Sequence, residues 1–450
     1  MLFDDKDVTV LDLTHGGIPL AQHIAKYAHS VTAVDVYGTT DEGVLAGLER
    51  SGIHVIRETA KNTNITTKHN TYLIVAPVHL DPAFLPGAGG HTIITHHQAV
   101  GELLSGLTSN TRIVEITGTG AKTSTATLLA DMASRNLSVV SHTSRGVEHW
   151  IKGVPTKVHH GLSITPGSIL EALEHSTGIQ ADLYIFEVSL GGTGMADIGI
   201  ITSLDNEYTI AKGRSTSTAA KLQMINKAKP GSTLLVNASA GHLTPPENVD
   251  IITFSDTTDA DVYLERSPGG IWTVHSNRGG TIRFTPNSGY DAGAYSTAIV
   301  CAVAAARLLH LEDAKIESAL MDFAGVHGRM RVVEWAGRRM VDNSNSGMTI
   351  RSVRQALDYS NGLVSSHDRK VLILGEEAKQ VCEGLDPTDA AHFIDERGNE
   401  LDTIILVGER MRNIQGGNVR TAASLESAIE MAESLTSEND IIISCVKCFR

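Results

Sequence analysis

Residues 112–133 read RIVEITGTGAKTSTATLLADMA, and this stretch decides the fold. An apolar strand runs into a loop of small residues, and a helical run follows. In the loop, Thr117 to Ser124, small side chains let successive backbone N–H groups turn toward a phosphate, and the helix adds its positive dipole end. Lys122 can then bridge phosphate oxygens, and the Thr123 hydroxyl can ligate Mg²⁺. The stretch predicts an ATP-binding loop in an α/β domain.

The loop departs from the strict GxxxxGK[ST] pattern at two positions. Ile116 stands where the first glycine belongs, and Ala121 replaces the glycine before Lys122. The alternative interpretation is a glycine-rich turn with an incidental lysine. The apolar strand before the loop and the helix after it favour the phosphate loop.

Strand-like and helical runs alternate on both sides of this stretch, which predicts parallel sheets. We expect three α/β domains in series: an N-terminal Rossmann-like substrate domain, a central ATP-binding domain and a C-terminal Rossmann-like domain, at residues 1–108, 109–325 and 326–450. The first domain has only Gly16 and Gly17 where a dinucleotide fingerprint needs three spaced glycines, so a nicotinamide oxidoreductase is poorly supported.

Composition excludes several classes of partner. The net charge is −14, aromatic residues make up 4%, and no Lys/Arg block stands out, so nucleic acid is an improbable partner. No apolar run reaches the roughly 18 residues that span a bilayer, and no signal pattern opens the chain. Four cysteines make no disulfide framework. We expect a cytoplasmic protein in which Cys445 and Cys448 are reduced thiols, with a metal or redox role for this CxxC pair as the minority alternative.

Further segments, in the same order, resemble the Mur ligase superfamily. Its central domain carries TG[TS]NGK[ST][ST] where this chain has TGTGAKTST, at residues 117–125. Other matching segments are YIFEVSLGG, ITSLDNEY, Ala220-Lys221-Leu222-Gln223, LLVNA, AAARLL and FAGVHGRMRVVEWAGRRMVDNSNS. The resemblance runs from residue 109 to the end of the chain and implies ATP-dependent activation of a carboxylate as an acyl phosphate.

Residue roles follow from this resemblance, position by position. It implies nucleotide binding by Thr117, Gly118, Thr119, Gly120, Ala121, Lys122, Thr123, Ser124, Arg329 and Asp342. It implies Mg²⁺ ligation by Thr123 and Glu187, with Lys221 as a lysine that becomes carbamylated and orients a second Mg²⁺. Lys122, Glu187 and Lys221 are therefore the expected catalytic residues.

The chain departs from the superfamily at several of these places. The usual Asn and Gly of the loop are Gly120 and Ala121, and Asn206 replaces the histidine that helps to hold the second metal. The adenine-framing HN…N pattern is absent, with Ala294, Tyr295 and Ala298 in its place. The number of Mg²⁺ ions and the modification of Lys221 stay open.

Within the superfamily, EVSLGGTGMADIGIIT and SHTSRGVE resemble the methanogen branch that acts on nickel tetrapyrroles, the coenzyme F430 synthases. This resemblance implies a propionate of a nickel seco-tetrapyrrole acid as the activated group and a carbon of the same molecule as the nucleophile, closing a six-membered carbocyclic ring. Nickel would enter only as part of the substrate. The local donors expected for substrate carboxylates are Arg145 and His142, with His149 and Lys152 nearby, and the pair His96 and His97.

Two other functions stay open at this point. The nearest is a Mur-type amide ligase that joins an amino acid to a carboxylate, in cell-wall or polyglutamate synthesis. The second is a non-catalytic NTP-binding protein, favoured by Gly120, Ala121 and Asn206 but opposed by the retained Lys122 and Glu187. The sequence leaves the oligomeric state open.

Overall fold

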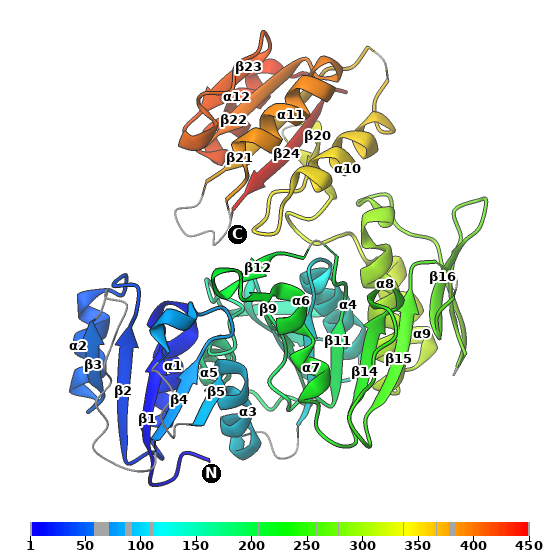
Figure 1. Cartoon of the computed structure of the whole chain (residues 1–450). Coiled ribbons are helices and arrows are strands. Elements are labelled where there is room, and N and C mark those ends of the chain that lie inside the picture. The colour runs from blue at the N-terminus through cyan, green and yellow to red at the C-terminus, as the bar shows by residue number, and fades with distance from the viewer. Residues whose placement is uncertain are drawn as a thin grey trace. The chain divides into compact units, whose positions relative to one another are not determined.

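The computed structural model contains three separate parallel or mixed sheets with helices packed on them (Figure 1). It describes residues 2–57, 72–85, 92–107, 111–205, 207–257, 259–277, 279–335, 337–365, 367–377 and 384–448. By contacts the chain divides into two compact units, the first 1–265, 274–282 and 298–316, the second 266–273, 283–297 and 317–450. The expected domain boundaries at 108/109 and 325/326 stay a prediction. Among the described residues, no helix is long and apolar enough to cross a bilayer.

The N-terminal sheet is five-stranded and parallel, in the order β3-β2-β1-β4-β5. Its strands are β1 (Asp7–Leu11), β2 (Ser30–Asp35), β3 (His54–Arg57), β4 (Tyr72–Ala76) and β5 (Thr92–Thr95). Its helical elements are η1 (Leu13–Gly17), α1 (Ile18–Ile24), α2 (Glu42–Arg50), η2 (Pro82–Phe84) and α3 (His96–Leu107). Strand order reverses between β1 and β4, so their following loops diverge and leave a place for a ligand at the carboxyl edge.

The central sheet has eleven strands in the order β18-β17-β16-β15-β14-β11-β6-β10-β7-β8-β9. The strands are β6 (Arg112–Thr117), β7 (Val139–Thr143), β8 (Gly146–Ile151), β9 (Val154–His159), β10 (Leu183–Glu187), β11 (Ile198–Ile201), β14 (Thr233–Asn237), β15 (Asp250–Ser255), β16 (Val262–Arg266), β17 (Trp272–Ser276) and β18 (Gly280–Phe284). Strand β6 lies between β11 and β10, parallel to both. All of its residues except Arg112 are buried, which is why its sequence is almost continuously apolar.

Helices and short elements complete this part of the chain. They are α4 (Lys122–Ser134), α5 (Ser168–His175), the ribbon β12 (Thr209–Ile210) with β13 (Ser215–Thr216), η3 (Ala211–Gly213), α6 (Ser217–Lys221), α7 (Gln223–Asn226), η4 (Ala238–Ala240), η5 (Ala292–Tyr295), α8 (Ser296–Leu308) and α9 (Asp313–Asp322). Helix α4 is buried along almost its whole length. It therefore holds the loop before it rigidly against the sheet.

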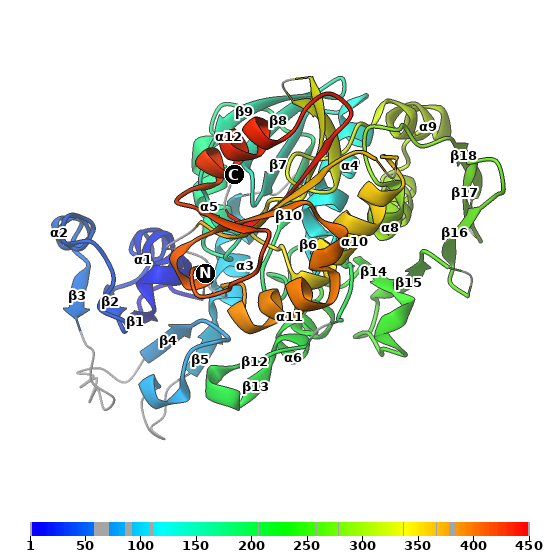
Figure 2. The ribbon, with the colours of Figure 1, turned by 90° about the horizontal axis from the view of Figure 1, so that it is seen from above.

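The third sheet belongs to the second unit and has the order β19-β20-β24-β21-β22-β23. Its strands are β19 (Arg331–Trp335), β20 (Arg338–Asp342), β21 (Lys370–Glu376), β22 (Thr403–Val407), β23 (Val419–Ala422) and β24 (Ile441–Lys447). Its helices are α10 (Ile350–Asn361), α11 (Pro387–Arg397), η6 (Gly398–Glu400), η7 (Glu409–Met411) and α12 (Leu425–Leu435), with α12 on the opposite face from α10 and α11 (Figure 2). Among the described strands of this sheet, β19 pairs with β20 antiparallel and the other neighbouring strands pair parallel.

Candidate functional site

The loop between β6 and α4 forms a strand–turn–helix unit, as a phosphate-binding loop requires. Gly118 has φ +140°, and a Cβ there would lie 2.0 Å from Thr202 Oγ1, so only glycine fits. Ala121 precedes the helix with φ 60°, in the left-handed region, and caps it with no side-chain hydrogen bond. A helix N-terminus with no side-chain cap and a positive dipole end suits an anion.

Residues after β11 and β14 support this loop from the side. Thr202 Oγ1 donates to the carbonyl of Gly120 at 2.5 Å, and Asn237 Nδ2 donates to the Thr202 carbonyl at 2.9 Å. The Thr119 amide donates to the Ser203 carbonyl at 3.0 Å. The loop is therefore fixed by hydrogen bonds to a neighbouring strand end before any ligand arrives, which lowers the entropy cost of binding.

Glu187, at the carboxyl end of β10, lies directly beside the start of α4. Its Oε2 accepts from Thr123 Oγ1 at 2.8 Å and from the Ser144 amide at 3.1 Å, and its Oε1 is 3.8 Å from Lys122 Nζ. Lys122 Nζ also donates to the Gly118 carbonyl at 3.2 Å. A hydroxyl and a carboxylate oxygen are hard ligands, so this pair fits the Mg²⁺ that accompanies a nucleotide. The structure thus brings together three residues that were predicted to act together.

Lys221 ends α6 and is 3% exposed, with its Nζ 5.2 Å from the centroid of the Tyr208 ring. Two residues on, Gln223 Nε2 donates to the Leu190 carbonyl at 2.7 Å, which ties this segment to the loop that follows Glu187. Asn206, the departure at the expected second metal position, lies outside the described residues. The carbamylation of Lys221 stays a prediction.

The predicted substrate-binding group at residues 142–152 is divided by the β7–β8 hairpin. Ser144 and Arg145 form the turn next to Glu187, whereas His149 lies along β8 and Lys152 follows its other end. Arg145 Nη2 pairs with Glu148 Oε1 at 3.1 Å, and Lys157 Nζ donates to the same oxygen at 2.8 Å. The Arg145 guanidinium is thus paired with Glu148, whereas His149 Nε2 lies 3.0 Å from Ser138 Oγ.

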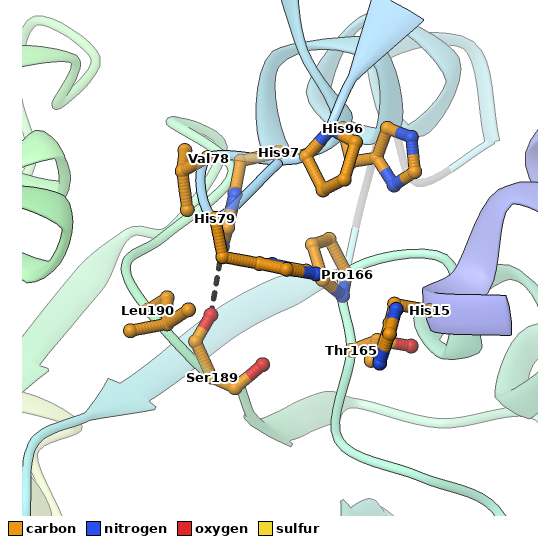
Figure 3. Close-up of a pocket in the computed structure, with 10 residues that line it drawn as sticks. His15, Val78, His79, His96, His97, Thr165, Pro166, Ser189 and Leu190 are labelled. Atoms are coloured by element: carbon orange, nitrogen blue, oxygen red, sulfur yellow. Dashed lines mark hydrogen bonds between the residues drawn. The ribbon is translucent and has the colours of Figure 1, made fainter. Parts of the chain in front are cut away.

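The three predicted substrate histidines are buried and contact backbone carbonyls. His142 Nε2 is 2.8 Å from the Ser163 carbonyl, His96 Nε2 is 2.9 Å from the Leu11 carbonyl, and His97 Nε2 is 2.8 Å from the Ser189 carbonyl, the contact dashed in Figure 3. Burial lowers the pKa of each of these imidazoles to about 4. A neutral imidazole attracts a carboxylate weakly, so this geometry favours Arg145 over the histidines.

In the second unit, Asp342 organises the segment that contains Arg329. Asp342 Oδ2 accepts from the Gly328 amide at 2.9 Å, and Asn345 Nδ2 donates to the Gly328 carbonyl at 2.7 Å. The Asp342 side chain is 1% exposed. These contacts make Asp342 a residue that positions the turn before Arg329, and the direct contact of either residue with nucleotide stays a prediction.

Three functional candidates were missed in the sequence. Thr202 and the Ser144 amide are found only through the sheet, because they follow strands distant in the chain. Glu115 could have been singled out from the sequence, since it is a charged residue inside the apolar strand RIVEIT. Burial raises the pKa of Glu115, against the opposing effect of hydrogen bonds from Thr193, whose amide donates at 2.7 Å. Glu115 thereby fixes the loop after Glu187 to β6.

The C-terminal CxxC shows no metal-like geometry among the described residues. Cys445 and Cys448 are both buried free thiols, and burial raises the pKa of Cys445 to about 12. The described residues contain one group of three His, Cys, Asp or Glu side chains close enough to share an ion, and it includes neither cysteine.

Solved structures with this arrangement define the class of protein. MurF ligase from Thermotoga maritima in complex with ADP matches with a TM-score of 0.55 at 14% identity, covering 100% of this chain and 96% of the other. Bifunctional folylpolyglutamate synthase/dihydrofolate synthase from Yersinia pestis, complexed with AMPPNP and Mn ion, matches with a TM-score of 0.56 at 17% identity, covering 78% and 90%. The α/β, three-domain Mur ligase-like architecture is thereby confirmed.

Sequence comparison narrows the class to one family. The chain is 44% identical to coenzyme F(430) synthetase of Methanosarcina acetivorans over 99% of each chain. The model for the coenzyme F430 synthetase CfbE C-terminal domain matches residues 332–448. The chain belongs to the coenzyme F430 synthetase family, a branch of the Mur ligase-like enzymes. The resemblance predicted from sequence is confirmed.

Proposed function

We propose that this protein is an ATP-dependent cyclo-ligase that completes a nickel tetrapyrrole coenzyme by forming a carbon–carbon bond. The support is the whole-length similarity to coenzyme F(430) synthetase together with the Lys122–Thr123–Glu187 cluster at the carboxyl edge of the central sheet. The relatives bound to ADP, or to AMPPNP and Mn ion, make a nucleotide with a divalent cation the matching ligands for that cluster. ATP as co-substrate fits a cytoplasmic location.

The first chemical step is phosphoryl transfer to a substrate propionate. A carboxylate oxygen attacks the γ-phosphorus of ATP, the bond to the β–γ bridging oxygen breaks, and ADP leaves. Lys122 neutralises charge on the transferred group, and Glu187 and Thr123 would hold Mg²⁺, which supplies further neutralisation of phosphate charge when bound. Arg145, at the turn beside Glu187, would orient a second carboxylate of the substrate.

The second step closes the ring within the same molecule. A substrate carbon loses a proton and attacks the acyl carbon, and inorganic phosphate leaves with the electron pair of the acyl–oxygen bond. Because nucleophile and acyl group belong to one molecule, proximity supplies much of the rate and no site for a second substrate is needed. The protein's remaining task is to keep water from the acyl phosphate.

A direct test supplies the purified full chain with ATP and Mg²⁺ and measures phosphate release by substrate. We expect release with nickel seco-tetrapyrrole acid, accompanied by the cyclised product in mass spectra, and none with amino acids alone. The amide-ligase alternative, suggested by the folylpolyglutamate synthase likeness, requires release that depends on an added amino acid. Release with amino acids and without cyclised product would overturn the proposal, and no release with any substrate would favour the non-catalytic alternative.

A further inference from the structure

Three side chains meet at the point where strand order reverses in the N-terminal sheet. Asp12 and His15 follow β1, and His79 follows the adjacent strand β4. Loops after two such strands diverge, which makes this edge the usual ligand position in open α/β sheets. Neither Asp12, His15 nor His79 has a role in the phosphoryl transfer described above.

Asp12 is a buried carboxylate with one oxygen anchored and the other turned to the histidines. Its Oδ1 accepts from the amides of Thr14 at 3.1 Å and His15 at 3.2 Å. Its Oδ2 lies 2.7 Å from His15 Nδ1 and 3.3 Å from His79 Nε2. Burial alone would raise the pKa of Asp12, but the hydrogen bond with His15 and the charges of the two imidazoles hold it well below its usual range. The group is therefore an anion with a preset orientation.

His79 Nε2 makes no hydrogen bond to any described residue, although the atom is buried from solvent. A buried polar atom without a hydrogen bond is unfavourable, so a ligand that binds it gains stability. The atom lies 3.3 Å from Asp12 Oδ2 without a hydrogen bond between them, so a third atom bound by both would satisfy it. Figure 3 shows the His79 side chain extending toward His15, and the two rings are 4.7 Å apart between centroids at 83°.

We propose that Asp12, His15 and His79 bind one divalent transition-metal ion of the Zn²⁺, Co²⁺ or Ni²⁺ class. One ligand atom from each residue lies within 4.8 Å of the others. Two imidazoles and one carboxylate suit borderline metals, whereas Mg²⁺ prefers oxygen ligands alone. On binding, the metal replaces the proton shared by His15 Nδ1 and Asp12, and that proton leaves to solvent.

The surroundings support the three ligands. His96 Nε2 contacts the carbonyl of Leu11, the residue before Asp12, and so fixes the backbone at the end of β1. Tyr37 packs edge-on against His15 at 5.9 Å, and Phe84 packs on Tyr37 at 6.0 Å. Backbone anchoring and an aromatic shell orient metal ligands and limit access of solvent.

A free ion fits this place better than the nickel of a tetrapyrrole. The pocket lined by His15 and His79 has a cavity volume of about 20 Å³, whereas pockets for drug-sized ligands measure roughly 300–1,000 Å³. Asp12 is fully buried behind the two rings. A cavity of this size has room for a single ion and none for a macrocycle. The inference is independent of the proposed cyclo-ligase activity.

The test is a metal titration of the tag-free, chelator-stripped full chain without nucleotide. Co²⁺ is followed by its visible absorption, and Zn²⁺ by competition against Co²⁺ and by calorimetry. We expect one site in the wild type and at least a tenfold loss of affinity in His79→Ala, with a matching loss of the metal-induced rise in Tm. His54→Ala is the control. It removes an exposed histidine at the start of β3, at the amino edge of the same sheet, and should bind Co²⁺ with wild-type affinity.

Further variants distinguish this metal site from the expected Mg²⁺ site. Glu187→Gln, which alters the expected Mg²⁺ position, should leave the Co²⁺ spectrum unchanged. Wild-type affinity in His79→Ala would overturn the proposal, provided that circular dichroism shows both variants folded. Binding of the nickel tetrapyrrole at this site without binding of any free ion would overturn the proposal as well. Asp12→Asn removes a second proposed ligand and should also lower the affinity for Co²⁺.

Discussion

Two strand-to-helix turns of the first unit, after β1 and after β6, share a backbone plan but differ in the sign of charge they offer. After β6, α4 begins without a side-chain cap, and Lys122 lies at its start. After β1, the amides of Thr14 and His15 are already occupied by Asp12 Oδ1. The turn after β6 therefore suits an anion. In the turn after β1, backbone donors are already bonded to Asp12, and the carboxylate of Asp12 lies at the turn instead. A strand, a glycine and a helix do not by themselves make a phosphate site, because a side chain directly after the strand, here Asp12, can occupy the first amides of the turn.

The largest effect on the comparison of the two turns is expected from Lys122→Ala. Loss of the Lys122 ammonium, which we expect to neutralise the transferred phosphoryl group, should lower ATP turnover at least about a hundredfold. Steady-state phosphate release measures the effect, and circular dichroism checks the fold. The matched control is Lys227→Ala, which removes an exposed lysine at the end of α7 and should leave ATP turnover unchanged. Turnover at the wild-type level in Lys122→Ala would remove this turn from the mechanism.

A second test adds one methyl group to the β6 turn. In Gly118→Ala, the new Cβ would lie 2.0 Å from Thr202 Oγ1 at φ +140°, so strain and overlap should lower the free energy of unfolding by about 2–5 kcal/mol. Gly120→Ala places its Cβ in open space and should be close to neutral. Urea denaturation of both variants gives the difference. Equal stability of the two would contradict the described loop.

The corresponding change in the β1 turn is Gly17→Ala. Its Cβ would lie 2.2 Å from the Asp12 carbonyl oxygen, a backbone atom that cannot move freely, so a loss of about 1–3 kcal/mol is expected. Gly47→Ala, in the middle of α2, meets only the end of Arg50 at 3.9 Å and should stabilise by roughly 0.5–1 kcal/mol. Urea midpoints should fall in Gly17→Ala and rise in Gly47→Ala. A rise in both variants would contradict the described turn after β1.

The smallest effect is expected from Ala121→Gly, which restores the superfamily's usual residue. Relief of the left-handed strain at φ 60° should exceed the entropy that glycine adds to the unfolded chain, for a net gain of about 0.5–1 kcal/mol. Thermal unfolding measures it. A destabilised variant would show that Ala121 is not held in the left-handed region.

Local patterns sufficed for the elements of the fold. The apolar runs at residues 112–117 and 183–187 are strands because both faces of a parallel strand are buried. The phosphate loop was predicted because its residue types carry the chemistry at fixed spacing. The substrate residues were harder, because His142 and Arg145 are three residues apart, yet His142 is fully buried whereas the Arg145 guanidinium is partly exposed and pairs with Glu148.

The sequence by itself determined the α/β class and the family and predicted the ATP loop, since each depends on residues that are neighbours in the chain. Tertiary structure decided which distant groups share a site. Thr202 reaches the Gly120 carbonyl, Ser144 reaches Glu187, and His79 reaches Asp12 across two strands. The physical reason is that parallel strands bring their carboxyl ends to one edge whatever their separation in sequence, and no local pattern records which strands become neighbours.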